Sequence, residues 1–295
     1  MKQVKKAVIT AAGFGSRFLP VVKSTPKEML PVVDKPILQY VVEECIDAGM
    51  EEIIIVVRKG NNVIRNYFFE ELHVAKQLLN QQGKDERYHA VQEVLNFKGI
   101  TIVDQDPDLP YGNGSPVITV KDKLEGEEAF AVLFADDLVL TKGDGAMKQV
   151  VDFYRASDDI EGVLGAQKVR VDEVDRYGIV KPVDGSEKED HGQVELVVEK
   201  PDIGSHPSTY ALYGRFIVPG RIFDFLKDDA TGKDDEVCLA DAIDKVAKSG
   251  KFMYKLIDGQ WYTTGDPVRY FEAQAKFMLA DERYGDKTRN IVDSL

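Results

Sequence analysis

The sequence predicts an α/β fold with a Rossmann-like, mixed but mostly parallel central sheet, helices on its faces and a smaller antiparallel portion. In the first half, short apolar runs alternate with longer helical patterns. Runs that are apolar at consecutive positions are typical of strands buried on both faces, as in a parallel sheet covered by helices. In the second half, strand-like runs are joined by polar turns such as DGSEKEDHG, which favours antiparallel pairing.

The expected strands of the first half cover residues 6–13, 51–58, 99–105 and 129–137. Between the first two, Pro36 opens a helix, because its fixed φ suits the first helical position. Ile37, Val41 and Cys45 fall on one face of that helix, and Gly49 stands where a C-cap belongs. The stretch 60–83 predicts a further helix or helix pair.

The expected strands of the second half cover residues 160–169, 177–183, 193–201, 209–219 and 252–259, with helices at 239–250 and 266–285. No linker or repeat divides the chain, so residues 1–295 are expected to form a single domain.

Composition narrows the function classes. The chain has 295 residues and a formal charge of −13, which argues against binding to nucleic acid or to an anionic membrane, because both need clustered Lys and Arg. No run approaches the ~20 apolar residues of a membrane span. The two cysteines, Cys45 and Cys238, lie far apart without metal-ligand spacing, which fits a reducing, cytoplasmic compartment.

The loop after the first expected strand is rich in glycine and cations. Gly13 and Gly15 allow a tight turn whose N–H groups could hold phosphate oxygens. Arg17, Lys23 and Lys27 follow in a segment that three prolines keep from becoming one helix. The glycine spacing matches neither the dinucleotide fingerprint nor a Walker loop. A plain strand-exit turn and a solvated basic loop therefore remain open beside a polyphosphate site.

Two further strand ends carry polar groups, and ligands of open α/β sheets bind at the carboxyl ends of strands. Asp136 and Asp137 follow a buried run, where a carboxylate could bind Mg²⁺ or simply form a turn. Gln105 and Gly112 follow another, where a base edge could be read, although a surface turn explains them equally well.

The end of the run VVEKP is a further expected strand end that carries polar side chains. Glu199 and Lys200 would point in opposite directions if the strand pattern held to its last residue. A carboxylate suits sugar hydroxyls and an ammonium suits a phosphate, while two solvated charges are the simpler alternative. No arrangement suggests a covalent nucleophile or a zinc site.

Taken together, these segments resemble the nucleotide-sugar pyrophosphorylases, and within them the bacterial enzymes that join UTP to glucose 1-phosphate. The resemblance lies in AAGFGSRFLPVVKSTPKEMLPVVDKPILQYVVEECIDAG, FADDL, RYGIV, VVEKP, YALYGRF and DEVCLADAID, which occur in the expected order over roughly residues 5–280. The part PKEMLPVVDKP is far more specific than the glycines.

The resemblance implies roles for individual residues. Nucleotide binding is implied for Ala11, Ala12, Gly13, Gly15, Glu28, Gln105, which would contact uracil, and Gly112. Contact with the triphosphate is implied for Arg17 and Lys27, Mg²⁺ binding for Asp136, contact with the glucosyl group for Gly178 and Glu199, and contact with the sugar phosphate for Lys200. Residues 1–140 would then form a nucleotide-binding half and residues 141–285 a sugar-phosphate-binding half. A homo-oligomer, dimer or tetramer, is also implied.

The chain departs from the family pattern at four positions. Ser115 and Pro116 stand where relatives have His-Ala, beside the expected base site. Thr263 replaces a usual aspartate and cannot be an anionic metal ligand, although Asp266 is near in sequence. Cys238 replaces a common glutamine.

The implied reaction is attack by a glucose 1-phosphate oxygen on the α-phosphorus of UTP, which releases pyrophosphate. Because the attacking phosphate is already ionised, no general base is required, and positioning and electrostatics should supply the catalysis by Arg17, Lys27 and Lys200. Two alternatives stay open: a related enzyme that uses dTTP or another hexose 1-phosphate, and a catalytically weak regulatory paralogue.

Overall fold

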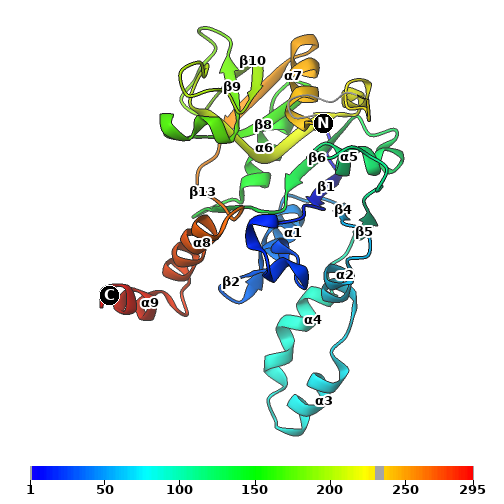
Figure 1. Ribbon diagram of the computed structural model, residues 1–295, viewed down its shortest axis with the longest axis vertical. Helices are drawn as coiled ribbons and strands as arrows, with labels where there is room; N and C mark the ends of the chain where they lie inside the picture. Colours follow the sequence, from blue (N-terminus) through cyan, green and yellow to red (C-terminus); the bar gives the residue numbers. More distant parts are fainter. Residues whose placement is uncertain (1, 230–235, 295) are drawn as a thin grey trace.

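A nine-stranded sheet runs through the molecule in the order β5-β4-β1-β6-β11-β8-β12-β10-β9 (Figure 1). The computed structural model describes residues 2–229 and 236–294. The strands of this sheet are β1 (Lys6–Ala11), β4 (Glu52–Val57), β5 (Ile100–Asp104), β6 (Ala129–Phe134), β8 (Gly162–Lys168), β9 (Gly178–Pro182), β10 (His191–Glu199), β11 (Tyr210–Pro219) and β12 (Phe252–Leu256).

Strands β5, β4, β1 and β6 pair in parallel, as the apolar runs of the first half predict. Strand β11 pairs antiparallel with both β6 and β8, and β10 pairs antiparallel with β12 and β9. The predicted fold class is therefore confirmed, and the antiparallel strands extend the same sheet rather than forming a separate one.

Both faces of the parallel strands are buried. Ile53 and Ile55 of β4 belong to one core cluster and Ile54 to another, because alternate side chains of a strand point to opposite faces. The first cluster includes α1 (Ile37–Asp47) and α6 (Ala146–Ala156), and the second includes α5 (Ser115–Thr119) and α7 (Leu239–Ser249). The expected helix face of Ile37, Val41 and Cys45 is fully buried.

The remaining helices lie toward the edges. The stretch 60–83 forms the helix pair α2 (Asn62–Phe69) and α3 (His73–Gln81), and with α4 (His89–Leu95) it makes an arm that projects from the body (Figure 1). Helices α8 (Pro267–Ala280) and α9 (Gly285–Val292) extend in another direction. Among the described residues, no helix is long and apolar enough to cross a bilayer.

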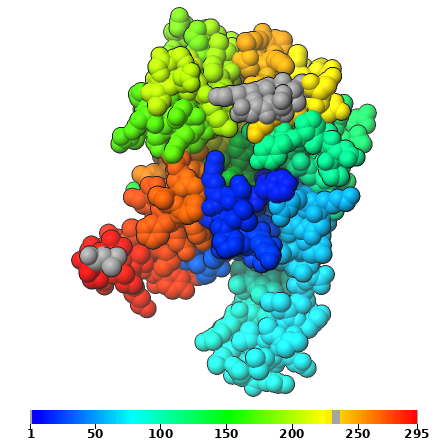
Figure 2. Space-filling view, in the orientation of Figure 1, coloured from blue at the N-terminus to red at the C-terminus, as the bar shows by residue number. Residues whose placement is uncertain are grey.

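The loop after β1 is built from short turns. Three 3₁₀ turns, Ser16–Phe18, Val21–Lys23 and Lys27–Met29, lead into the hairpin of β2 (Pro31–Val32) and β3 (Lys35–Pro36). This segment, dark blue in Figure 2, lies beside the orange residues that lead into α8. Contacts between Phe18 and Tyr270 and between Arg17 and the Gly265 carbonyl join the two segments.

A second small sheet borders this loop. Strands β7 (Asp137–Leu140) and β13 (Gln260–Thr263) pair antiparallel, so that Thr263 lies opposite Asp137. The short strand β13 was not expected from the sequence. It brings the segment before α8 to the carboxyl end of β6.

Candidate active site

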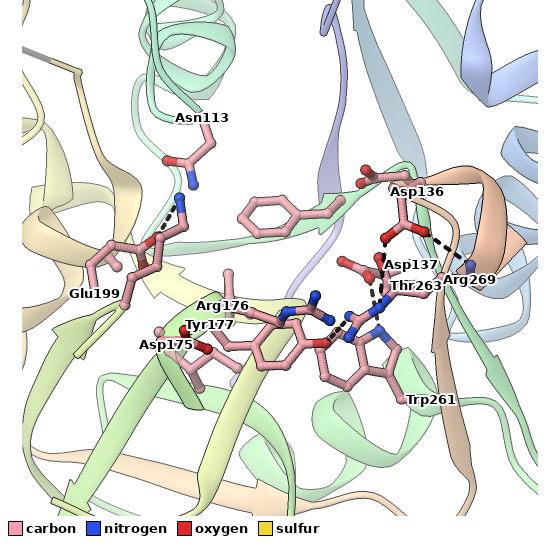
Figure 3. Close-up of a pocket in the computed structure, with 18 of the residues that line it drawn as sticks. Asn113, Asp136, Asp137, Asp175, Arg176, Tyr177, Glu199, Trp261, Thr263 and Arg269 are labelled. Carbon is pink, nitrogen blue, oxygen red and sulfur yellow. Dashed lines mark hydrogen bonds and ion pairs between the residues drawn. The ribbon is translucent and has the colours of Figure 1, made fainter. Parts of the chain in front are cut away.

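A cavity of about 570 Å³ opens at the carboxyl end of β6, between that strand, the end of β10 and the start of α8. Five sequence-predicted residues line it: Arg17, Asp136, Gly178, Glu199 and Lys200. In Figure 3, Asp136 and Glu199 lie on opposite sides of the cavity. The cavity therefore joins the expected metal ligand to the expected sugar-binding residues.

Asp136 follows the last residues of β6 and is held by backbone contacts. Its carbonyl accepts hydrogen bonds from the N–H and the hydroxyl of Thr264, at 2.7 and 2.8 Å. Its carboxylate accepts a 2.5 Å bond from Lys27 Nζ. Burial opposes ionisation of Asp136, but Lys27 and, more weakly, Arg17 outweigh it and hold the pKa of this carboxyl below its ordinary value.

Lys27 joins two carboxylates. Besides Asp136, its ammonium lies 3.9 Å from an oxygen of Glu28. Burial alone would lower the pKa of Lys27, but Asp136 and Glu28 together raise it. Gly13 lies against this lysine, since a Cβ there would lie 3.5 Å from Lys27 Cε, in ordinary van der Waals contact. Lys27 is thus charged and lies against the glycine loop.

Glu28 is almost completely buried, at 1% exposure, and one of its oxygens has no hydrogen-bond partner among the described residues. Burial raises its pKa to about 7, and Lys27 only partly opposes this. Glu28 therefore carries unused hydrogen-bonding capacity beside the glycine loop.

Asp137 is also buried, but it faces protein groups. Trp261 Nε1 donates to Asp137 Oδ1 at 2.7 Å, and Thr263 lies opposite Asp137 in the pairing of β13 with β7. Burial and the neighbouring Asp136 raise the pKa of Asp137 to about 7. The departure at Thr263 thus places a neutral residue opposite Asp137 in place of a second anion.

The side of the cavity opposite Asp136 is formed where β10 ends. Lys200 has φ +45°, so the strand pattern stops at Glu199 and the lysine turns back until its Nζ lies 3.6 Å from Glu199 Oε1. The expectation that these two side chains diverge therefore fails, because its condition of a continuing strand is not met. Gly178 lies against Glu199, since a Cβ there would lie 3.2 Å from Glu199 Oε2.

The other sequence-predicted residues lie outside this cavity. Ala11, Ala12, Gly13, Gly15, Lys27, Glu28, Gln105 and Gly112 are absent from its lining. Gln105 follows β5, and its N–H donates to the carbonyl of Val57 at 2.7 Å. The neighbouring end of β4 carries Arg58, which lies over the ring of Phe14 in the glycine loop.

The loop that contains Gly112 is tied to the start of α7. Val237 N–H donates to the Tyr111 carbonyl, and the Gly114 N–H donates to the Val237 carbonyl, both at 2.9 Å. Gly112 has φ +146°, and a Cβ there would lie 2.2 Å from the Val237 oxygen. Only glycine suits this position. The loop therefore has one fixed shape beside the glycine loop, whose Phe14 ring lies 6.4 Å from that of Tyr111.

Several lining residues were missed by sequence reasoning. They are Asn113, Arg176, Tyr177, Trp261 and Arg269. Arg176 and Tyr177 belong to the motif RYGIV, which offered a signal, and the single tryptophan offered another. Arg269 pairs with Glu173 at 3.0 Å and donates to the Tyr177 hydroxyl. Nothing local in the sequence connects Arg269 to residues more than ninety positions away.

Two of the other departures, and the nearby Asp266, lie where helices begin. Ser115 begins α5, and its hydroxyl donates to the Pro110 carbonyl. Asp266 caps α8 by accepting from Val268 N–H and Arg269 N–H, both at 3.1 Å. Cys238 is a free thiol at the start of α7 and does not line this cavity. Asp235, the first residue of the motif DEVCLADAID, lies outside the described residues.

Comparison with known proteins agrees with this geometry. The nucleotidyl transferase family model matches residues 6–279. The chain is 35% identical to UTP–glucose-1-phosphate uridylyltransferase of Bacillus subtilis (strain 168), covering 100% of this chain and 98% of the relative.

Two solved structures are also similar. A UTP-bound UGPase from Acinetobacter baumannii has a TM-score of 0.87 and 29% identity, with 99% of this chain and 100% of that chain covered. A UDP-glucose pyrophosphorylase complexed with UDP-glucose has a TM-score of 0.80 and 30% identity, with 95% and 100% covered. The expected resemblance is confirmed: the chain belongs to the nucleotidyl transferase family and, within it, to the UTP–glucose-1-phosphate uridylyltransferases.

Proposed function

We propose that this protein makes UDP-glucose and pyrophosphate from UTP and glucose 1-phosphate. The observation that carries the proposal is one cavity lined at one end by Asp136, which pairs with Lys27 behind it, and at the other by the Glu199–Lys200 pair. Relatives of this chain carry the corresponding activity in their names, and the similar solved structures hold UTP and UDP-glucose.

In this proposal the nucleotide lies on the loop after β1. The backbone of Ala11, Ala12, Gly13 and Gly15 receives the phosphates and base, and Gln105 and Gly112 border the uracil. Glu28 supplies its unpartnered oxygen to the nucleotide, since Glu28 lies beside Gly13. These assignments rest on the family motifs and on the closeness of the Gly13 and Tyr111 segments.

The sugar phosphate lies at the other end of the cavity. Glu199 accepts hydrogen bonds from glucosyl hydroxyls, and Gly178 leaves them room by its missing side chain. The Lys200 ammonium holds the phosphate whose oxygen attacks. Since that phosphate is ionised at neutral pH, catalysis consists of bringing two anions together and stabilising the charge that develops on the leaving pyrophosphate. Arg17 and Lys27 have this second role.

The residues present fit a Mg²⁺ ion. Asp136 offers a carboxylate at the edge of the cavity, already ionised and paired with a cation. No group of three or more His, Cys, Asp or Glu side chains that could hold a metal occurs among the described residues. Mg²⁺ usually takes one or two carboxylates and completes its octahedron with phosphate oxygens and water. When bound, it neutralises phosphate charge and draws electrons from the α-phosphorus.

Lys27 and Asp136 would then change partners on substrate binding. In the described structure each neutralises the other. With the triphosphate in place, Lys27 is free to pair with phosphate oxygens, and Asp136 is free to bind the metal. Their pairing keeps both side chains in position before the substrate arrives.

We extend the proposal to organisation and location. Residues 1–140 would hold the nucleotide and residues 141–285 the sugar phosphate within one domain, which is supported by the single nine-stranded sheet to which both stretches contribute. A homo-oligomer, dimer or tetramer, and a cytoplasmic location are proposed from the family.

The test is pyrophosphate release from UTP or dTTP with glucose 1-phosphate or galactose 1-phosphate, measured with Mg²⁺ and with EDTA. We expect turnover with UTP and glucose 1-phosphate only when Mg²⁺ is present, and a loss of about a hundredfold in Asp136→Ala. Wild-type rates in Asp136→Ala at limiting Mg²⁺ would disprove the metal assignment. Nucleotide binding without turnover of any pair would indicate a regulatory paralogue instead.

A further inference from the structure

Arg215, in the motif YALYGRF, is completely buried in the middle of β11. Its Nε and one terminal nitrogen donate to the two carboxylate oxygens of Glu44 in α1, each at 2.8 Å. A buried ion pair is often no more stabilising than apolar residues of similar volume. Stability alone therefore does not account for a charged pair at the centre of this fold.

Besides the Gly214 carbonyl at 2.9 Å, Arg215 donates to the backbone on both sides of Asp136. The guanidinium donates to the Asp137 carbonyl at 2.7 Å and to the Phe134 carbonyl at 3.3 Å. These two residues stand before and after the turn that carries Asp136. Thr264 holds the Asp136 carbonyl itself. Hydrogen bonds from both Arg215 and Thr264 thus hold the turn between β6 and β7.

A bulge in β11 places Arg215 there. The stretch from Leu212 to Phe216 pairs with only Ala166 to Leu164 of β8. Within it, Gly214 has φ +76°, and a Cβ would lie 2.4 Å from the Phe134 ring. Bulges of this kind redirect side chains and often occur next to active sites.

Glu44 is held independently of Arg215. One of its oxygens accepts a 2.6 Å hydrogen bond from the Met147 N–H, in the first turn of α6. A carboxylate is favoured at the N-terminus of a helix, where N–H groups are unpaired. Glu44 therefore joins α1, α6 and β11, and it fixes the guanidinium that contacts the Asp136 turn.

We propose that Arg215, oriented by Glu44, is a positioning residue that sets the Asp136 carboxylate for the metal-bound triphosphate. The inference rests on the proposed function, in which Asp136 binds Mg²⁺. Groups that orient a metal ligand without touching the metal typically contribute 10- to 100-fold in metal affinity or activity. Arg215 would act in this way through the backbone on both sides of Asp136.

The test compares Arg215→Met, Arg215→Lys and Glu44→Gln with the wild type. Arg221→Met is the matched control, because Arg221 also pairs with a glutamate, Glu161 at 2.6 Å, but contacts no residue of the Asp136 turn. Calorimetric titration gives the Kd of UTP with Mg²⁺ and with EDTA. The ratio of the two values measures how strongly the metal is coupled to nucleotide binding.

We expect Arg215→Met to keep the UTP affinity in EDTA within about twofold and to lose about 10- to 100-fold of the gain that Mg²⁺ provides. For Arg215→Lys, the gain in UTP affinity from Mg²⁺ should lie between the gains of the wild type and of Arg215→Met. Excess Mg²⁺ should restore part of the rate of pyrophosphate release of this variant. Arg221→Met should lower the melting temperature without changing the ratio of the UTP Kd values with EDTA and with Mg²⁺.

A wild-type ratio in any folded Arg215 variant would overturn the inference, as would failure of all three variants to fold, since the pair would then be purely structural. Failure of the proposed function is a separate result. It would be seen as no gain from Mg²⁺ in the wild type, or as an unchanged gain in Asp136→Ala.

Discussion

Glu28→Gln should make the free protein more stable, and increasingly so as the pH rises. The carboxyl group of Glu28 is 1% exposed, and one oxygen has no partner among the described residues. Glutamine has nearly the same shape and cannot ionise. The substitution therefore removes a buried ionisable group without opening a cavity.

The direction of this pH dependence follows from the protonation of Glu28 in the native and the unfolded state. Burial raises the pKa of Glu28 from 4.5 to about 7, so the native state retains a proton that the unfolded chain releases between these values. Stability is then lost as the pH rises through that window, because the unfolded state alone gains from ionisation. At about 1.4 kcal/mol per pH unit, the loss approaches about 3.5 kcal/mol above pH 7. About 2.5 kcal/mol of it should appear between pH 5 and pH 8.

The assay is urea unfolding of the wild type and Glu28→Gln without ligands at pH 5, 6, 7 and 8. Burial also raises the pKa of Asp137 to about 7, but that group is present in both proteins and cancels in their difference. Glu125→Gln, on an exposed residue, is the control. Unfolding free energies that differ by a constant amount across this range would refute the reasoning, because Glu28 would then be ionised or paired in the native state already at pH 5.

Three other outcomes are expected. Lys200→Ala should lower kcat/KM for glucose 1-phosphate about a hundredfold while leaving the Kd of UTP unchanged, since the ammonium is proposed to hold only the sugar phosphate; an equal loss in both would contradict this. Gly112→Ala should weaken UTP binding in a titration, because its Cβ would lie 2.2 Å from the Val237 oxygen at a φ of +146°, and unchanged affinity would show that the loop adapts. Trp261→Phe should lower the unfolding free energy by about 1–3 kcal/mol at pH 8, because the buried Asp137 loses a donor at 2.7 Å; no change in urea unfolding would mean that the bond contributes nothing.

Much of the fold could be predicted because strands buried on both faces leave continuous apolar runs. Strands β1, β4, β5 and β6 each fall within their expected ranges for this reason. Strand β13 (Gln260–Thr263) has no such run, since it pairs only with β7, and its identity depends on a partner more than one hundred residues away. Helix α6 was overlooked although its buried face is regular.

The residues of the candidate site that lie at strand ends could be predicted from the sequence. Asp136 follows β6, and Glu199 ends β10, so the pattern of strands located both. The partners of these groups were not predictable from spacing. Lys27 reaches Asp136 across 109 positions, and Arg215 reaches Glu44 across 171. In β11 the single charge among apolar residues gave no indication that it would be buried, because the bulge at Gly214 that directs it inward leaves no periodic signal.

The charges of the cavity explain why a metal ion belongs to the proposed reaction. Among the described residues, its lining holds four basic side chains, Arg17, Arg176, Lys200 and Arg269, and five carboxylates, Asp136, Asp137, Asp175, Glu199 and Asp266. A cavity without an excess of cations does not by itself attract a triphosphate and a sugar phosphate. Pairs such as Lys27–Asp136 keep the charged groups ordered in the free protein. In the proposed reaction Asp136 would hold the metal, and Lys27 would then pair with the phosphates. Under the proposed function, substrate binding would be an exchange of partners among groups already in place, which would limit the reorganisation needed when charge develops on the leaving pyrophosphate.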